Sequence, residues 1–259
     1  MADTDVNTAP TASRGAADRY ARYTGLAVGA LAACLLAPLH DGDGVLYAIP
    51  AFGLCAVGGV LLGDALNAPA RSSVRAASLT PRRVRDYVPP RMTVLLLVLA
   101  VALLALLAIA GAVATPDDLG RAGRQLALTC GGVTEGRGPW PGFYYGVPIL
   151  AALAVATIAC GWSLRRIATR IGDERSRRDR SLAIVAAWGI VVSTSLLGTA
   201  STAAGALSDM TCDGTAGTVA NAILLPLAVV SLVTAPWMLF TVCSPRAAWW
   251  HRTNRGARR

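Results

Sequence analysis

Long blocks of apolar residues alternate with short polar segments along the chain. The blocks are about 20 residues long, which is the length an α-helix needs to cross the roughly 30 Å hydrocarbon core of a bilayer. Between Val94 and Ala114 there is no polar side chain at all, so a helix there has no face to turn towards water. Six such blocks predict six transmembrane helices, over residues 24–39, 45–66, 93–114, 145–164, 182–207 and 218–242.

The expected fold class is therefore all-α, a polytopic transmembrane helical bundle of six spans. The composition agrees, since 54% of the 259 residues are hydrophobic and only 15% are charged, against about a quarter in soluble domains. We expect a disordered N-terminal tail over residues 1–22, a transmembrane domain over 23–243 and a basic C-terminal tail over 244–259.

The positive charges, all of them arginine, determine the expected orientation. Of the 24 arginines, 21 lie before the first block, between the second and third, between the fourth and fifth, or after the sixth. Only Arg121, Arg124 and Arg137 lie in the other connections. Cytoplasmic loops retain arginine. Both termini are thus expected in the cytoplasm, and the protein in the cell membrane.

The basic stretch between the second and third blocks contains a candidate short helix. Thr80 can cap it, Pro81 suits its first position, and Arg82, Arg83 and Arg85 follow. We expect this helix to lie on anionic lipids of the inner leaflet, which attract each arginine by about 1 kcal/mol. Docking of a membrane or cytoplasmic protein partner is the alternative, and no nucleic acid is expected to bind.

The longest connection on the other side covers residues 115–144. Asp117 and Arg121 are four residues apart, as in a helical ion pair, and predict a short helix from Asp117 to about Leu128. The connection also contains Cys130. Cys130 and Cys212 are the two of six cysteines in exported loops, where oxidation occurs, so a disulfide between them is predicted. Two unpaired thiols beyond bonding distance are the alternative.

Candidate chemistry inside the membrane is sparse. Thr194 and Ser201 share one face of the fifth block, and Asn221 follows in the sixth; together they form either a helix-packing face or a polar path. Asp64 lies near the end of the second block, with Arg71 as its expected partner. No catalytic or cofactor-binding motif is present, and a solvated turn is the expected state of the weak metal candidate at 40–44.

The segments "SLTPRRVRDYVPPRMT" and "PWPGFYYGVP", with the Leu-rich block between them, carry a resemblance over residues 78–149. This part of the chain resembles uncharacterised multi-pass integral membrane proteins of actinobacteria. The resemblance implies the membrane topology and assigns no activity, cofactor or site residue.

Two functions remain open. The first is an accessory or sensory membrane component without catalytic activity and without a cofactor. The alternative is a permease or transporter subunit, with a path lined by the fifth and sixth blocks, because polar side chains inside a membrane often mark substrate pathways.

Overall fold

Six α-helices and one β-hairpin make up the part of the chain that the computed structural model describes, which is residues 9–38, 44–66, 89–169, 174–211 and 214–245. The helices are α1 (Ala9–Leu36), α2 (Val45–Leu66), α3 (Pro90–Val113), α4 (Phe143–Thr169), α5 (Glu174–Ser208) and α6 (Gly214–Cys243). Each helix covers most of one predicted apolar block, and α1 and α5 begin well before theirs. The hairpin consists of β1 (Leu126–Cys130) and β2 (Val133–Arg137).

Five of these helices, α2 to α6, are long and apolar enough to cross a membrane. The prediction of a helical membrane bundle is confirmed to that extent. The first helix does not meet the same measure, because Arg19 and Arg22 shorten its apolar part. The described residues therefore hold five candidate spans, one fewer than the six predicted.

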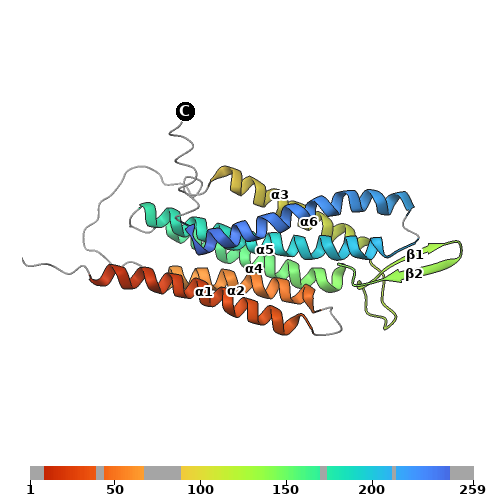
Figure 1. Ribbon diagram of the computed structural model, residues 1–259, viewed down its shortest axis with the longest axis horizontal. Helices are drawn as coiled ribbons and strands as arrows, with labels where there is room; N and C mark the ends of the chain where they lie inside the picture. Colours follow the sequence, from red (N-terminus) through yellow and green to blue (C-terminus); the bar gives the residue numbers. More distant parts are fainter. Residues whose placement is uncertain (1–8, 39–43, 67–88, 170–173, 212–213, 246–259) are drawn as a thin grey trace, which may run out of the picture.

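Successive helices run in alternating directions, so the bundle has two ends (Figure 1). The hairpin lies at one, which we call the hairpin end. We call the other the arginine-rich end. Among the described residues it holds Arg19, Arg22, Arg91, Arg165, Arg166, Arg175, Arg177, Arg178 and Arg180, and the hairpin end holds Arg121, Arg124 and Arg137.

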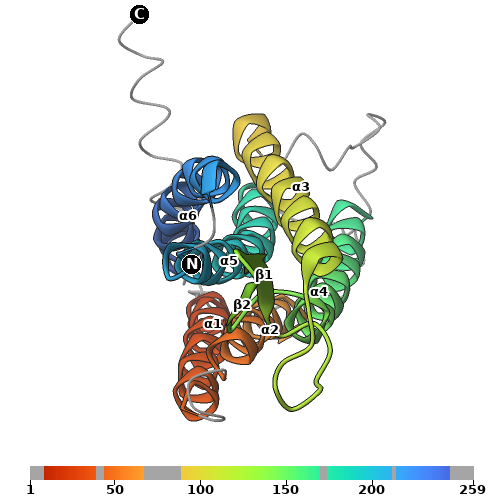
Figure 2. The ribbon, with the colours of Figure 1, turned by 90° about the vertical axis from the view of Figure 1, so that its right-hand side faces the viewer.

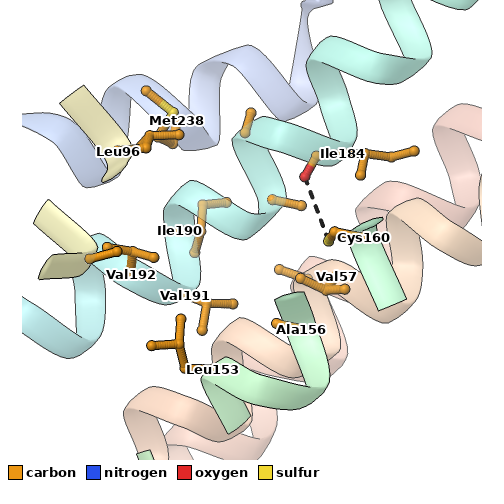
Figure 3. Packing of buried hydrophobic residues seen from close by; sticks show 14 of the residues in the cluster. Val57, Leu96, Leu153, Ala156, Cys160, Ile184, Ile190, Val191, Val192 and Met238 are labelled. Atoms are coloured by element: carbon orange, nitrogen blue, oxygen red, sulfur yellow. Dashed lines mark hydrogen bonds between the residues drawn. The ribbon is translucent and has the colours of Figure 1, made fainter. Parts of the chain in front are cut away.

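The central helix is α5. Seen along the bundle, α2, α3, α4 and α6 surround it (Figure 2). Its apolar stretch is 83% buried, against 22% to 44% for the other four candidate spans. Small side chains allow this, because alanine, serine and glycine let neighbouring backbones approach closely. In the core, Leu96 of α3 and Met238 of α6 lie side by side against α5 (Figure 3), and a Cβ atom added at Gly189 would lie 3.0 Å from each of them.

Glycines bring α1 and α2 into direct contact. A Cβ atom added at Gly25 would lie 2.6 Å from the Cα atom of Gly59, and one added at Gly29 would lie 3.0 Å from the carbonyl oxygen of Phe52. Near the arginine-rich end, a Cβ atom at Gly63 would lie 2.6 Å from a carboxylate oxygen of Asp18. The two helices therefore pack against each other over most of the length of α2.

The predicted helix from Asp117 to about Leu128 is wrong. Residues 117–124 form turns, and β1 begins at Leu126. Gly120 and Gly123 have φ values of 75° and 77°, which end any helix there, because only glycine adopts this region at little cost. The turn of the hairpin uses Gly131 and Gly132 at φ values of 58° and 84°, as a tight two-residue hairpin turn requires.

The predicted disordered tail over residues 1–22 is also wrong in part, because α1 begins at Ala9. Other predictions concern residues outside the described part of the chain. These are residues 1–8, most of the basic C-terminal tail, the stretch with Arg71, Thr80, Arg82, Arg83 and Arg85, the segment 40–43 and Cys212.

Candidate functional site

The predicted polar face does not converge on one place. The Thr194 hydroxyl donates to the carbonyl oxygen of Ile190 at 2.7 Å, and the Ser201 hydroxyl donates to that of Gly198 at 3.1 Å. Both bonds lie within α5 itself. Asn221 of α6 donates from Nδ2 to the hydroxyl oxygen of Ser208 at 3.4 Å, near the hairpin end. These contacts fit a helix-packing face.

Two other hydroxyl groups in the helix core differ from these. Ser195 of α5 and Ser231 of α6 are 1% and 0% exposed, and neither oxygen has a hydrogen-bond partner. A buried hydroxyl without a partner costs free energy, on the order of 1–3 kcal/mol. Ser231 was missed in the sequence, because a single serine in an apolar block gives no sign that its oxygen is unsatisfied.

At the hairpin end, residues 114–142 form a folded cap over the bundle, which we call the hairpin cap. Its first turn is built on Asp117, whose Oδ1 accepts hydrogen bonds from the backbone N–H groups of Leu119 and Arg121 at 3.1 and 2.8 Å. Oδ2 accepts from the Arg121 side chain at 2.8 Å and from Arg124 at 3.3 Å. Desolvation acts to raise the pKa of Asp117, but the Arg121 hydrogen bonds outweigh it and hold the pKa below its usual value.

Arg124 joins the hairpin cap to α4. It is 7% exposed, and its Nε and Nη2 atoms donate to the hydroxyl oxygen of Tyr145 at 3.2 and 3.0 Å. Its guanidinium carbon also lies 4.9 Å from the ring centre of Tyr144, within cation–π range. Tyr47 of α2 completes an aromatic cluster, with ring centres 6.1 Å from Tyr144 and 5.7 Å from Tyr145.

Further contacts attach the hairpin cap to α3 and α5. Trp140 donates from Nε1 to the carbonyl oxygen of Ala110 at 2.9 Å. Glu135 on β2 accepts from the backbone and the hydroxyl of Thr211 at 3.1 and 2.7 Å, which holds the pKa of Glu135 below its usual value. Arg137 donates to the carbonyl oxygen of Asp209 at 3.1 Å. Hydrogen bonds therefore connect β2 to the residues that directly follow α5.

At the arginine-rich end, an ion pair connects α5 to α2, and a hydrogen bond connects α1 to α6. Arg180 of α5 lies 3.3 Å from the carboxylate of Asp64 on α2, which is 6% exposed. Arg22 and Asp18 pair within α1. Arg22 also donates to the carbonyl oxygen of Val242 at 3.3 Å, where the end of α6 leaves carbonyl groups without helical partners. The expected partner of Asp64, Arg71, lies outside the described residues.

The cysteines are only partly described. Cys34, Cys55, Cys160 and Cys243 are free thiols. No two cysteines within the described ranges bond to each other. Because Cys212 lies outside them, the Cys130–Cys212 bond stays a prediction. Across the same ranges, no group of three histidine, cysteine or acidic side chains is placed to hold a metal ion.

Sequence reasoning missed the contacts that organise both ends. Arg180 and Asp64 are 116 positions apart, and Arg124 and Tyr145 are 21 apart, so no local spacing connects them. One signal was present for Arg124, since it is one of three arginines on a side that otherwise lacks them. An arginine in these connections runs against the charge bias of the chain, which is a reason to look for a specific partner.

Comparison with protein-family models, with curated proteins and with solved structures finds no match. The candidate sites therefore rest on their geometry.

Proposed function

We propose that the chain is a non-catalytic accessory or sensory component of the cell membrane, in which α5 couples the hairpin cap to the arginine-rich end. The observation that supports this most is the position of α5. Glu135 and Arg137 of the hairpin hold the residues at its end, Asp209 and Thr211, and Arg180 near its start pairs with Asp64. Between these contacts runs one helix of 35 residues, about 50 Å long.

A long helix packed on all sides moves as one body, because close-packed interiors resist compression. A ligand or partner that shifts the hairpin cap would therefore shift the start of α5. The Asp64–Arg180 pair, and the arginines around it, would report that shift on the other side of the membrane. The polar groups that a sensor needs are thus at the two ends of the bundle.

The proposed topology has six spans, with α1 as the first. Its support is the contact with α2, in which Gly63 of α2 lies beside Asp18 of α1 and Phe52 of α2 lies beside Gly29 of α1. The first helix therefore runs alongside most of α2, which is itself long enough to span the membrane. Both termini are proposed to be cytoplasmic, because arginines gather at the end where α1 begins and α6 ends.

The cytoplasmic connections are proposed to contact the bilayer and a protein. Arg82, Arg83 and Arg85 would lie on anionic inner-leaflet lipids, and a membrane or cytoplasmic partner would receive the signal. Nucleic acid is not a proposed partner, since the arginine distribution already has an explanation in topology.

A permease or transporter subunit is the second candidate. The observation in its favour is that two buried hydroxyls, Ser195 on α5 and Ser231 on α6, have no hydrogen-bond partner, since a solute or water in the membrane could bind such groups. Against it, Thr194 and Ser201 bond within their own helix.

Hydrogen exchange in lipid nanodiscs tests the coupling. In the variant Glu135→Ala, we expect amide exchange to rise at the start of α5, in residues 175–182, as well as in β2. The matched control is Val133→Ala, which alters a side chain on the same strand that is 65% exposed. Exchange at 175–182 that is the same in both variants and the wild type would exclude the coupling.

Flux through proteoliposomes separates the two candidates. An accessory or sensory component conducts no solute above the rate of empty liposomes. For a permease, substitution of Thr194, Ser201 or Asn221 is expected to alter the flux, so solute movement that responds to these changes would favour the second candidate.

A further inference from the structure

One face of α4 leads from apolar side chains to a tryptophan and then to two arginines. Exposed residues recur every three to five positions along it, which places them on the outward side of the helix. They are Val147, Leu150, Val155, Ile158 and Trp162. Arg165 and Arg166 are exposed and follow within about one turn, at the arginine-rich end. The order matches the layers of a lipid leaflet, from acyl chain to interface to headgroup.

Trp162 and Arg166 are in contact at the point where this face becomes polar. The guanidinium carbon of Arg166 lies 4.8 Å from the ring centre of Trp162, which is 63% exposed. The ring holds the guanidinium group near the interface. Arg165 and Arg166 have other neighbours within the chain. Each guanidinium group carries five donors, so it can bind a phosphate in addition to a partner within the chain.

A second tryptophan approaches α4 from α5. Trp188 donates from Nε1 to the hydroxyl oxygen of Thr157 at 2.9 Å. Gly161 is one turn further along the same side of α4, and a Cβ atom added there would meet no atom within 4 Å. The surface beside Trp162 therefore has open space at the depth where the first part of an acyl chain lies.

We propose that this face of α4 binds an anionic glycerophospholipid, whose phosphate is held by Arg165 and Arg166 and whose acyl chain lies along Trp162, Gly161 and Ile158. Charge complementarity selects the anionic headgroup, because two adjacent arginines repel a lipid cation and form paired hydrogen bonds with phosphate. The inference does not depend on the accessory role proposed above. It needs only that α4 spans the bilayer.

Quenching of tryptophan fluorescence by brominated lipids tests the proposal at the residue concerned. The full-length protein is placed in vesicles of phosphatidylcholine that contain a small fraction of either brominated phosphatidylglycerol or brominated phosphatidylcholine. The contribution of Trp162 is the difference between the wild type and Trp162→Phe. We expect the anionic lipid to quench this contribution at a much lower mole fraction than the zwitterionic lipid.

Charge variants distinguish a specific lipid site on α4 from the general attraction between a positively charged protein and anionic lipids. Each arginine near an anionic surface strengthens binding about fivefold, so Arg165→Gln with Arg166→Gln should weaken the preference about 25-fold. Arg91→Gln is the control for one removed charge, to be compared with Arg165→Gln or Arg166→Gln alone, since Arg91 is exposed on α3 at the same end of the bundle. Replacement of both arginines by lysine keeps the charge, and should retain most of the preference even where the glutamine variant folds poorly.

Three outcomes would overturn the proposal. The first is equal quenching by the two lipids in the wild type. The second is an equal loss of preference in Arg91→Gln and in the single variants Arg165→Gln and Arg166→Gln. The third is displacement by inorganic phosphate at the same ionic strength as a chloride control, which would identify a free-anion site in place of a lipid site.

Discussion

Arg180 on α5 and Asp64 on α2 form an ion pair of 3.3 Å, in which the aspartate side chain is 7% exposed and the arginine side chain 21%. A charge so far from water needs its partner, because desolvation without pairing is costly. The pair therefore fixes the start of the central helix against α2, at the end of the bundle where the arginines gather.

Removal of the carboxylate should destabilise the protein. For Asp64→Asn we expect a loss of about 1–3 kcal/mol in the free energy of unfolding, because a partly buried guanidinium group loses its charged partner. Unfolding by sodium dodecyl sulfate in mixed micelles measures it. In a cycle with Arg180→Gln, the double variant should lose less than the sum of the single losses. Strict additivity, or an equal loss for the exposed Asp118→Asn, would contradict the assignment.

The contact between α1 and α2 should tolerate a methyl group at one glycine and not at its neighbour. A Cβ atom at Gly59 would lie 2.7 Å from the Cα atom of Gly25, whereas one at Gly58 would meet nothing within 4 Å. We expect Gly59→Ala to destabilise the fold by about 1–3 kcal/mol through overpacking, and Gly58→Ala to cause no loss. The midpoint of thermal unfolding in detergent compares them, and equal midpoints would rule out close packing at Gly59.

The attachment of the hairpin to α5 should weaken in acid. The Thr211 hydrogen bonds lower the pKa of Glu135 below its usual 4.5. This carboxylate therefore contributes its full stabilisation above pH 4.5, and the contribution is lost as the pH falls through the lowered pKa. Amide exchange at Thr211, corrected for the intrinsic rate, should rise over that range in the wild type and not in Glu135→Gln. The same pH dependence in both proteins would assign it to another group.

Cys130 and Cys212 should react with thiol reagents only after reduction. The two cysteines are 82 positions apart, and a bond between them would stabilise the fold by about 4 kcal/mol through loop-closure entropy. A membrane-impermeant maleimide is applied to intact cells before and after a reductant. Labelling of both residues without reductant would disprove the bond. Cys130→Ser should then leave Cys212 reactive from the start, which identifies the pair.

Reporter fusions should place both ends of the chain in the cytoplasm. Alkaline phosphatase is active only after export, so a fusion after the last residue is expected to be inactive, and a fusion in the hairpin cap after Gly131 is expected to be active. An active C-terminal fusion would reverse the orientation. An inactive C-terminal fusion combined with an N-terminus on the outside would leave five spans, with α1 lying outside the membrane.

The sequence by itself determined the helices, because the length of an apolar run is a local property. The predicted span 45–66 coincides with α2, and the predicted ends of the other spans differ from the helices by a few residues, apart from the earlier starts of α1 and α5. Local patterns failed where one spacing fits two structures. Asp117 and Arg121 do pair, as predicted, but through a turn that the glycines at 120 and 123 allow.

Only the tertiary structure decided which polar groups meet. The small and polar residues of the fifth apolar block indicated one packing face, but the structure buries α5 on nearly all sides at the centre of the bundle. Asp64 meets Arg180, and Arg124 meets Tyr145, because helices that are distant in sequence become neighbours. Burial and ion pairing depend on those neighbours, and hydrophobic runs of similar length and composition do not encode which helix packs against which.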